Sequence, residues 1–138
     1  MKLNKDILIK ELGIEVATLV DPGEKGVPYV CEEPPAYCEF ISFLVRHTDN
    51  LGRVRAIAEN FRKFKAPHKN QIRYCFTHKG IRYAIPKERL IYAWYMDEDV
   101  EEWDYVEFID NDLGLDEKYY PTNLKLIKGE PIYGKEEA

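Results

Sequence analysis

The chain has 138 residues, of which 45% are hydrophobic, 33% charged and 13% aromatic. That length predicts a single domain with a core of its own, and the composition excludes a disordered tail or a collagen-like chain. There is no run of about 18 apolar residues and no signal-like N-terminus, so we expect neither a membrane span nor secretion. The three cysteines form no C-x-x-C pair, so we expect reduced thiols and a cytoplasmic protein.

The net charge of −5 hides a strong asymmetry along the chain. Residues 1–50 hold five Lys and Arg against nine Asp and Glu, residues 51–92 hold eleven against two, and residues 93–138 hold four against fourteen. A basic middle followed by an acidic end has two interpretations. The two blocks neutralise each other in the fold, or they form separate surfaces for anions and for cationic partners.

The first half of the chain predicts one short helix and two strands. Asn4 or Asp6 caps a helix that Gly13 ends, because a capping residue and a glycine bracket apolar residues at helical spacing. Residues 27–31 and 37–45 are rich in β-branched and aromatic side chains and are separated by turn-forming residues. Both segments are therefore predicted strands.

The second half predicts a hairpin, a helix and a further strand. Residues 71–77 and 81–85 pair through a tight turn in which Gly80 supplies a positive φ. A proline starts the helix that follows over residues 87–96, and Leu, Ile and Trp recur there at helical spacing. Residues 103–109 alternate between apolar and acidic side chains, which is typical of a strand.

Three segments carry recognisable motifs in a fixed order. Residues 49–55 read D-N-L-G-R-V-R, residues 86–95 read P-K-E-R-L-I-Y-A-W-Y, and residues 106–112 and 122–126 read V-E-F-I-D-N-D and T-N-L-K-L. The first segment resembles the signature S-N-L-G-R-V-R of a nuclease-associated DNA-binding module. The second resembles the stretch H-R-L-V-Y-x-A-F. The third resembles the pair V-D-H-I-D-G-N and E-N-L-R-L. All three belong to the HNH homing-type endonucleases of phages and introns, and the resemblance spans residues 47–128.

The resemblance and the predicted elements together imply the organisation of the chain. The fold class is α+β, with a small antiparallel sheet, one main helix and a remnant ββα HNH-like unit at the C-terminal end. We expect residues 1–138 to form a single domain. Its parts are an unassigned N-terminal region (1–46), a basic region like the nuclease-associated module (47–96), a degenerate HNH-like unit (97–128) and a tail (129–138).

The resemblance also shows that the catalytic positions of the family are altered. In HNH nucleases a histidine is the general base, and a neighbouring carboxylate and a helix residue hold one divalent cation. Phe108 matches the base, Glu107 matches the adjacent ligand, and Asn123 is retained, whereas no Asn or His lies near Ile132, where the helix ligand is expected. Glu88 replaces a further histidine. Because phenylalanine cannot accept a proton, the resemblance implies the scaffold without the catalytic residues.

An acidic run after the predicted helix indicates the first functional hypothesis. Ordered carboxylates can occupy a groove built for phosphates. We therefore expect a non-catalytic, HNH-like phage or mobile-element protein that inhibits a host nuclease or defence complex, as an anti-CRISPR-type inhibitor in a bacterial cytoplasm. A solvated acidic face is the alternative, and the oligomeric state stays open. The acidic surface is assigned to Asp97, Glu98, Asp99, Glu101, Glu102, Asp104, Asp110 and Asp112.

The basic middle indicates the second hypothesis, sequence-tolerant DNA binding. Interleaved basic and aromatic residues suit a phosphate backbone, and the matching module of the family contacts DNA. A solvated basic loop is the alternative. The expected contacts are Arg53, Arg55, Arg62, Lys63, Lys65, Lys69, Arg73 and Arg82.

The third hypothesis is a metal-dependent DNA endonuclease with an altered site. Mg²⁺ prefers oxygen ligands, which Glu107, Asp110 and Asp112 would offer. Outside this hypothesis we expect no cofactor. One further set of residues has the sulfur and imidazole donor atoms that zinc prefers. The spacing of the cysteines in this set is loose, however, and two of its residues would point to opposite faces of a strand. That set, which we do not expect to bind zinc, is Cys31, Cys38, Cys75 and His78.

The remaining histidines and tryptophans have structural interpretations. His47, His68 and His78 lie near no serine or cysteine in a nucleophile setting, so we expect them at the surface or in turns. Trp94 and Trp103 are predicted to anchor the core.

Overall fold

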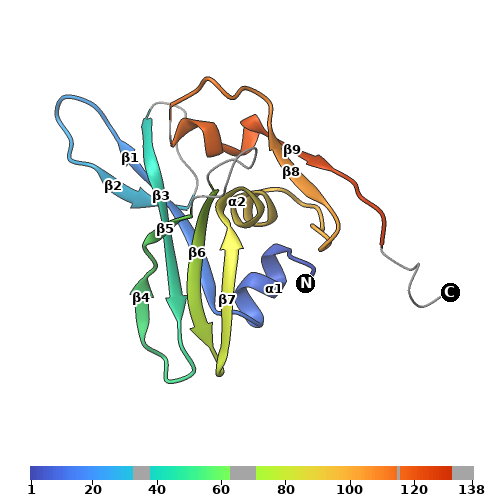
Figure 1. The fold of residues 1–138 in the computed structure, drawn as a ribbon. Coiled ribbons are helices and arrows are strands. Elements are labelled where there is room, and N and C mark those ends of the chain that lie inside the picture. The colour runs from blue at the N-terminus through green and yellow to red at the C-terminus, as the bar shows by residue number, and fades with distance from the viewer. Residues whose placement is uncertain (33–37, 63–70, 115, 132–138) are drawn as a thin grey trace, which may run out of the picture.

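The structure is a computed structural model, and it describes residues 1–32, 38–62, 71–114 and 116–131. Two α-helices, two short 3-10 helices and nine strands follow one another along the described parts of the chain (Figure 1). In chain order they are α1 (Lys5–Lys10), β1 (Ile14–Asp21), β2 (Tyr29–Cys31), β3 (Glu39–Thr48), β4 (Val54–Ala56), β5 (Glu59–Arg62), β6 (Gln71–His78), β7 (Ile81–Pro86), α2 (Lys87–Tyr95), β8 (Tyr105–Phe108), η1 (Glu117–Tyr119), η2 (Pro121–Asn123) and β9 (Leu124–Ile127).

The strands form three antiparallel sheets, with the orders β2-β1-β3-β4, β5-β6-β7 and β8-β9. β4 pairs with β3 in the first sheet, and β5 pairs with β6 in the second sheet. Because β5 follows β4 after only a few residues, the chain connects the two sheets directly at this point. Between them the backbone N–H of Ile57 donates to the carbonyl of Val45 at 2.8 Å. The result is a curled antiparallel sheet with one main helix, which confirms the predicted α+β class.

The core lies inside the curl of the sheet. Val45 of β3 and Tyr74 of β6 are almost fully buried and belong to one cluster with Leu90 and Ile91 of α2. Figure 1 shows α2 beside the ends of β6 and β7, with β8 and β9 beyond it. Burial of this apolar surface is the main force that holds the helix on the sheet.

The N-terminal helix forms as predicted. The side chain of Asn4 accepts a hydrogen bond from the backbone of Ile7 at 2.8 Å, which satisfies one of the free N–H groups of the first turn. Gly13 follows with φ +66°, and its carbonyl accepts from the backbone of Thr48 at 2.8 Å. A Cβ at this glycine would lie 2.4 Å from the carbonyl oxygen of Thr48, so the close approach of β3 requires a residue without one.

The C-terminal unit contains the two strands of the predicted ββα arrangement. Phe108 of β8 pairs with Leu124 of β9, and the chain between them carries η1 and η2. The helix of such a unit would follow β9. Residues 128–131 are not helical, and residues 132–138 lie outside the described residues.

Among the described residues, no helix combines the length and the apolar character that crossing a membrane requires.

Candidate nucleic-acid interface

A groove opens where the curled sheet divides. β5 covers only the first half of one edge of β6, up to Tyr74, and no described strand pairs with that edge at residues 75–78. A cavity of about 600 Å³ lies there, between β4 and the second half of β6. Because the nearly buried residues His47 and Phe76 line it, the groove reaches down to the core.

The rim of the groove is held in place by the turn before β4. The carboxylate of Asp49 accepts hydrogen bonds from the backbone of Leu51 and of Arg53, each at 2.9 Å, and from Nε of Arg53 at 2.8 Å. The backbone hydrogen bond from Arg53 is the main reason why the pKa of Asp49 is lowered. An ionised Asp49 therefore fixes both the turn and the guanidinium of Arg53 at the rim.

Two further arginines line the groove from different sheets. Arg55 lies on β4 opposite His47 of β3, and Arg82 lies on β7 opposite Thr77 of β6. Both arginines are exposed. Within the part of the chain that the structure describes, neither of them forms an ion pair. Their positive charges are consequently available to an anion.

The second carboxylate that lines the groove, Glu59, is already paired. It accepts from the ammonium of Lys87, whose side chain is only 1% exposed, and from the hydroxyl of Tyr74 at 3.3 Å. Lys87 also lies 3.5 Å from the carboxylate of Asp116 and 4.5 Å from the ring centre of Tyr119. Because the charge of Glu59 is compensated at Lys87, it does little to offset the arginines.

His47, which lines the groove, forms a buried pair with His78, which does not line it. Nε2 of His47 lies 2.9 Å from Nδ1 of His78, so one ring donates a hydrogen bond to the other. Burial is the main cause that lowers the pKa of His47; the neighbouring His78 lowers it further, and Asp49 opposes this. The expectation that these histidines lie at the surface or in turns is therefore wrong for both, because strand pairing turns them inward. His68 lies outside the described residues.

The structure brings together three of the eight predicted nucleic-acid contacts, namely Arg53, Arg55 and Arg82. Arg73 is half-buried on β6 and does not line the groove, and its Nε has no hydrogen-bond partner among the described residues. The side chain of Arg62 and the whole of Lys63, Lys65 and Lys69 lie outside what the structure describes.

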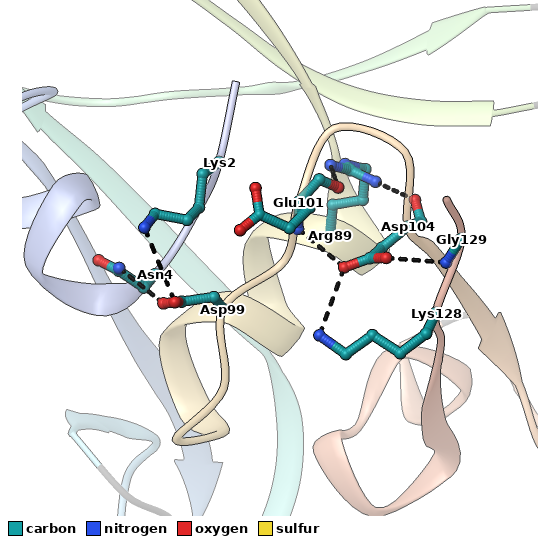
Figure 2. A network of polar contacts seen from close by, with 8 residues as sticks. All are labelled: Lys2, Asn4, Arg89, Asp99, Glu101, Asp104, Lys128 and Gly129. Atoms are coloured by element: carbon teal, nitrogen blue, oxygen red, sulfur yellow. Dashed lines mark hydrogen bonds and ion pairs between the residues drawn. The ribbon is translucent and has the colours of Figure 1, made fainter. Parts of the chain in front are cut away.

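Most of the predicted acidic surface is exposed, but some of its members are tied to the rest of the fold. Figure 2 shows Asp99 turned toward the N-terminal segment, where it accepts from Asn4 at 2.9 Å and lies 3.8 Å from the ammonium of Lys2. Glu102 pairs with the N-terminal ammonium of Met1 at 2.8 Å. These ion pairs are exposed and therefore weak.

One member of the predicted acidic surface is buried. Asp104 accepts from the backbone of Glu101 and of Gly129, each at 2.9 Å, and lies 3.6 Å from the ammonium of Lys128 (Figure 2). Burial raises the pKa of Asp104, but these hydrogen bonds outweigh that effect, so the net shift is downward. Asp104 therefore organises the loop before β8 and does not belong to an interaction surface, which corrects the sequence-based assignment.

Arg89 of α2 holds the same loop from the other side. Its two terminal nitrogens donate to the carbonyl of Asp104 at 2.6 Å and to that of Glu101 at 3.0 Å, as Figure 2 shows. Burial lowers the pKa of Arg89, and the nearby carboxylates of Glu88 and Asp104 oppose the shift. This arginine is thus a structural residue, and its charge is not available to the groove.

The positions that the resemblance to HNH nucleases matches to site residues, Glu107, Phe108 and Asn123, lie on β8 and directly before β9. Phe108 packs edge-on against Tyr119, with ring centres 5.0 Å apart. The ammonium of Lys118 lies 4.4 Å from the centre of the Phe108 ring. Asn123 is buried; its side chain accepts from the backbone of Asp110 at 2.9 Å and donates to the carbonyls of Asp110 at 3.0 Å and Lys118 at 2.8 Å. These contacts stabilise the loop between β8 and β9.

No predicted metal set comes together among the described residues, where no three His, Cys, Asp or Glu side chains lie close enough to hold a metal ion. Glu107, Asp110 and Asp112 are each exposed, and a side-chain oxygen of Asp110 accepts from the backbone of Asp112 at 2.9 Å. The four residues of the zinc set also stay apart. Cys31 lies on β2 and Cys75 and His78 on β6, which belong to different sheets, and Cys38 lies 3.4 Å from the hydroxyl of Tyr29.

The groove residues that were not predicted from the sequence include His47, Phe61 and Thr77. The period of two along a strand places alternate residues on one face, but it cannot show which strand lies opposite. The spacing of Asp49 before Gly52 and Arg53 was a usable signal for the turn at the rim. In tight turns an Asp side chain typically accepts a hydrogen bond from the backbone N–H two residues later in the chain.

Searches against known proteins returned nothing for this chain: no family model, no curated protein and no solved structure matches it.

Proposed function

We propose that this protein binds nucleic acid at the groove between β4 and β6, through contacts to the phosphate backbone, and does not cleave it. The observation that carries the proposal is that Arg55 and Arg82 reach one groove from two sheets without a carboxylate partner among the described residues. Arg53 adds a third guanidinium at the rim.

The chemistry of arginine favours a phosphate as the ligand. A guanidinium donates two parallel hydrogen bonds to a phosphate and keeps its charge at all physiological pH values. Arginines on separate strands suit a ligand with phosphates at intervals better than a single small anion. Thr77 lines the same cavity and adds a hydroxyl that can donate to a phosphate oxygen. Such contacts do not read bases, so binding is expected to tolerate many sequences.

A relationship to HNH nucleases belongs to the same proposal. It is supported by the order of the hairpin β6–β7, helix α2 and the antiparallel pair β8–β9, which follow one another where the motifs require them. The absence of cleavage is supported by Phe108, whose ring packs against Tyr119 at the position that matches the general base. Under this proposal the binding module is retained and the catalytic unit serves as scaffold.

The test compares the double variant Arg55→Ala, Arg82→Ala with the control variant Lys125→Ala. Lys125 is exposed on β9 and does not line the groove. Fluorescence anisotropy of a labelled single strand should show at least about tenfold weaker binding for the double variant and a salt slope smaller by about 1.4, since each lost phosphate contact removes about 0.7. Equal losses in the double variant and in the control would contradict the assignment of the groove.

A second candidate function is inhibition of a host nuclease or defence complex through the acidic turn after α2. It is favoured by one observation, which is that Asp97, Glu98 and Asp99 are consecutive and exposed. We would measure DNA cleavage by a purified CRISPR nuclease complex with the wild-type protein and with the double variant Asp97→Lys, Glu98→Lys. Inhibition by the wild type that the variant loses would support this function, and equal effects of the two proteins would contradict it.

A further inference from the structure

We infer that the groove takes single-stranded rather than double-stranded nucleic acid, with an unpaired base stacked on Phe61. This inference rests on the proposed function, since it names the ligand class of the same groove. Phe61 lies on β5 and is 57% exposed, and it lines the cavity that Arg55 and Arg82 also line. The groove is thus lined by an accessible aromatic ring and by two guanidinium groups that form no ion pair with any residue the structure describes.

An exposed phenylalanine beside arginines is of use only to a ligand that offers apolar surface between its charges. In a duplex the bases are stacked inside and the outer surface is phosphate and sugar, so Phe61 would gain little. In a single strand each base has a free face that stacks on an aromatic ring, whatever its identity. The arginines would hold the flanking phosphates while the ring holds a base.

The depth of the groove also favours a single strand. His47 and Phe76, which line it, are 8% and 7% exposed, so the groove reaches down to nearly buried side chains. Its volume of about 600 Å³ lies within the range of small-ligand pockets, about 300–1,000 Å³, so an unpaired base of a flexible strand can enter it. A rigid duplex would touch only the arginines at the rim.

Three probes test the wild-type protein. They are oligothymidylate of about 16 nucleotides, an abasic strand of the same length and a matched duplex. At one salt concentration, anisotropy should show oligothymidylate bound about tenfold tighter than either of the other two. The abasic strand keeps the phosphates and lacks the bases, so it separates stacking from charge without any change to the protein.

Variants at Phe61 locate the stacking ring. Phe61→Ala should lose about tenfold in affinity for oligothymidylate and change binding of the abasic strand little, whereas Phe61→Trp should keep or improve affinity. The control is Tyr105→Ala, because Tyr105 is an aromatic residue that is 66% exposed on β8 and does not line the groove.

The outcomes separate the inference from the function it rests on. Equal binding of all three probes, or tighter binding of the duplex, would overturn the single-strand inference and leave the proposed function standing. Binding of oligothymidylate that Phe61→Ala leaves unchanged would overturn the role of Phe61. No binding of any probe at low salt would overturn the proposed function itself.

Discussion

His47 and His78 come from two different sheets and meet through a single hydrogen bond of 2.9 Å between Nε2 and Nδ1. Both rings are buried, and His47 also packs against the ring of Phe76, with ring centres 4.9 Å apart. Along the chain, Arg46 directly precedes His47, Asp49 follows the end of β3, and Lys79 follows His78 in the hairpin turn. The pair therefore links the two sheets beside the groove, which His47 lines.

The first prediction concerns the pH dependence of stability. Because the pKa of His47 is lowered in the folded state, the unfolded chain binds more protons once the pH falls below the ordinary histidine pKa of about 6.5. The free energy of unfolding should therefore drop as the pH falls through that value and level off below the lowered pKa. Urea unfolding between about pH 8 and pH 5 should show a steeper loss in the wild type than in His47→Gln. A variant at least as steep as the wild type would contradict this.

The second prediction concerns Lys87, the only lysine among the buried residues of the described chain. Glu59→Ala removes its closest carboxylate and the acceptor of the Tyr74 hydroxyl. Among the described residues, the buried ammonium is then left with one carboxylate, that of Asp116, and with aromatic rings such as that of Tyr119. Since Glu59 is partly exposed, we expect a loss of about 2 kcal/mol in the free energy of unfolding, below the full cost of breaking a buried pair. Glu130→Ala, an exposed glutamate near the end of the described chain, is the control and should change stability little.

The third prediction compares two glycines with positive φ. Gly13 has φ +66° and Gly80 has φ +79°, but only at Gly13 would a Cβ meet backbone, 2.4 Å from the oxygen of Thr48. Gly80→Ala should therefore cost about 1 kcal/mol from the backbone conformation alone. Gly13→Ala should cost clearly more, because β3 must also move away. Thermal unfolding of the two variants measures the difference, and equal losses would show that the close approach is not important.

The fourth prediction separates two aspartates of the acidic segment. Asp104→Ala leaves the backbone N–H groups of Glu101 and Gly129 without their acceptor, and should lower the free energy of unfolding by about 2 kcal/mol. Asp97→Ala changes an exposed side chain and should stay within about 0.5 kcal/mol of the wild type. Because the folded pKa of Asp104 is lowered, its contribution should also vanish as the pH falls through that value. An Asp104 variant as stable as the Asp97 variant would refute the structural role of Asp104.

Local signals in the sequence were enough to predict the elements that depend on them. The Lys79-Gly80 pair between two strand-like segments predicts the hairpin β6–β7. In the structure both residues adopt positive φ, as such a two-residue turn requires. The start of α1 followed from Asn4 in the same way. Strand β1 was missed, although it is one of the two inner strands of its sheet, since most of residues 14–20 are buried and the period of two is absent.

The groove itself could not be predicted, because it depends on how β4 and β5 divide between two sheets. Three of the arginines assigned to nucleic acid line it, but no local pattern distinguishes Arg82, which lines it, from Arg73, which does not. The same limit applies to the acidic segment, where Asp97 and Asp104 look alike in sequence. Only the tertiary contacts with Gly129 and Lys128 make Asp104 a buried residue.

The central claim is that the groove binds nucleic acid through its phosphates. The most direct test is anisotropy of labelled oligothymidylate against the wild-type protein from low to physiological salt, with Mg²⁺ present and a gel of the same sample. We predict binding at low salt that weakens with a slope of about −2, as expected for three phosphate contacts, and an intact strand on the gel. Absence of binding at low salt, or affinity that does not change with salt, would contradict the claim.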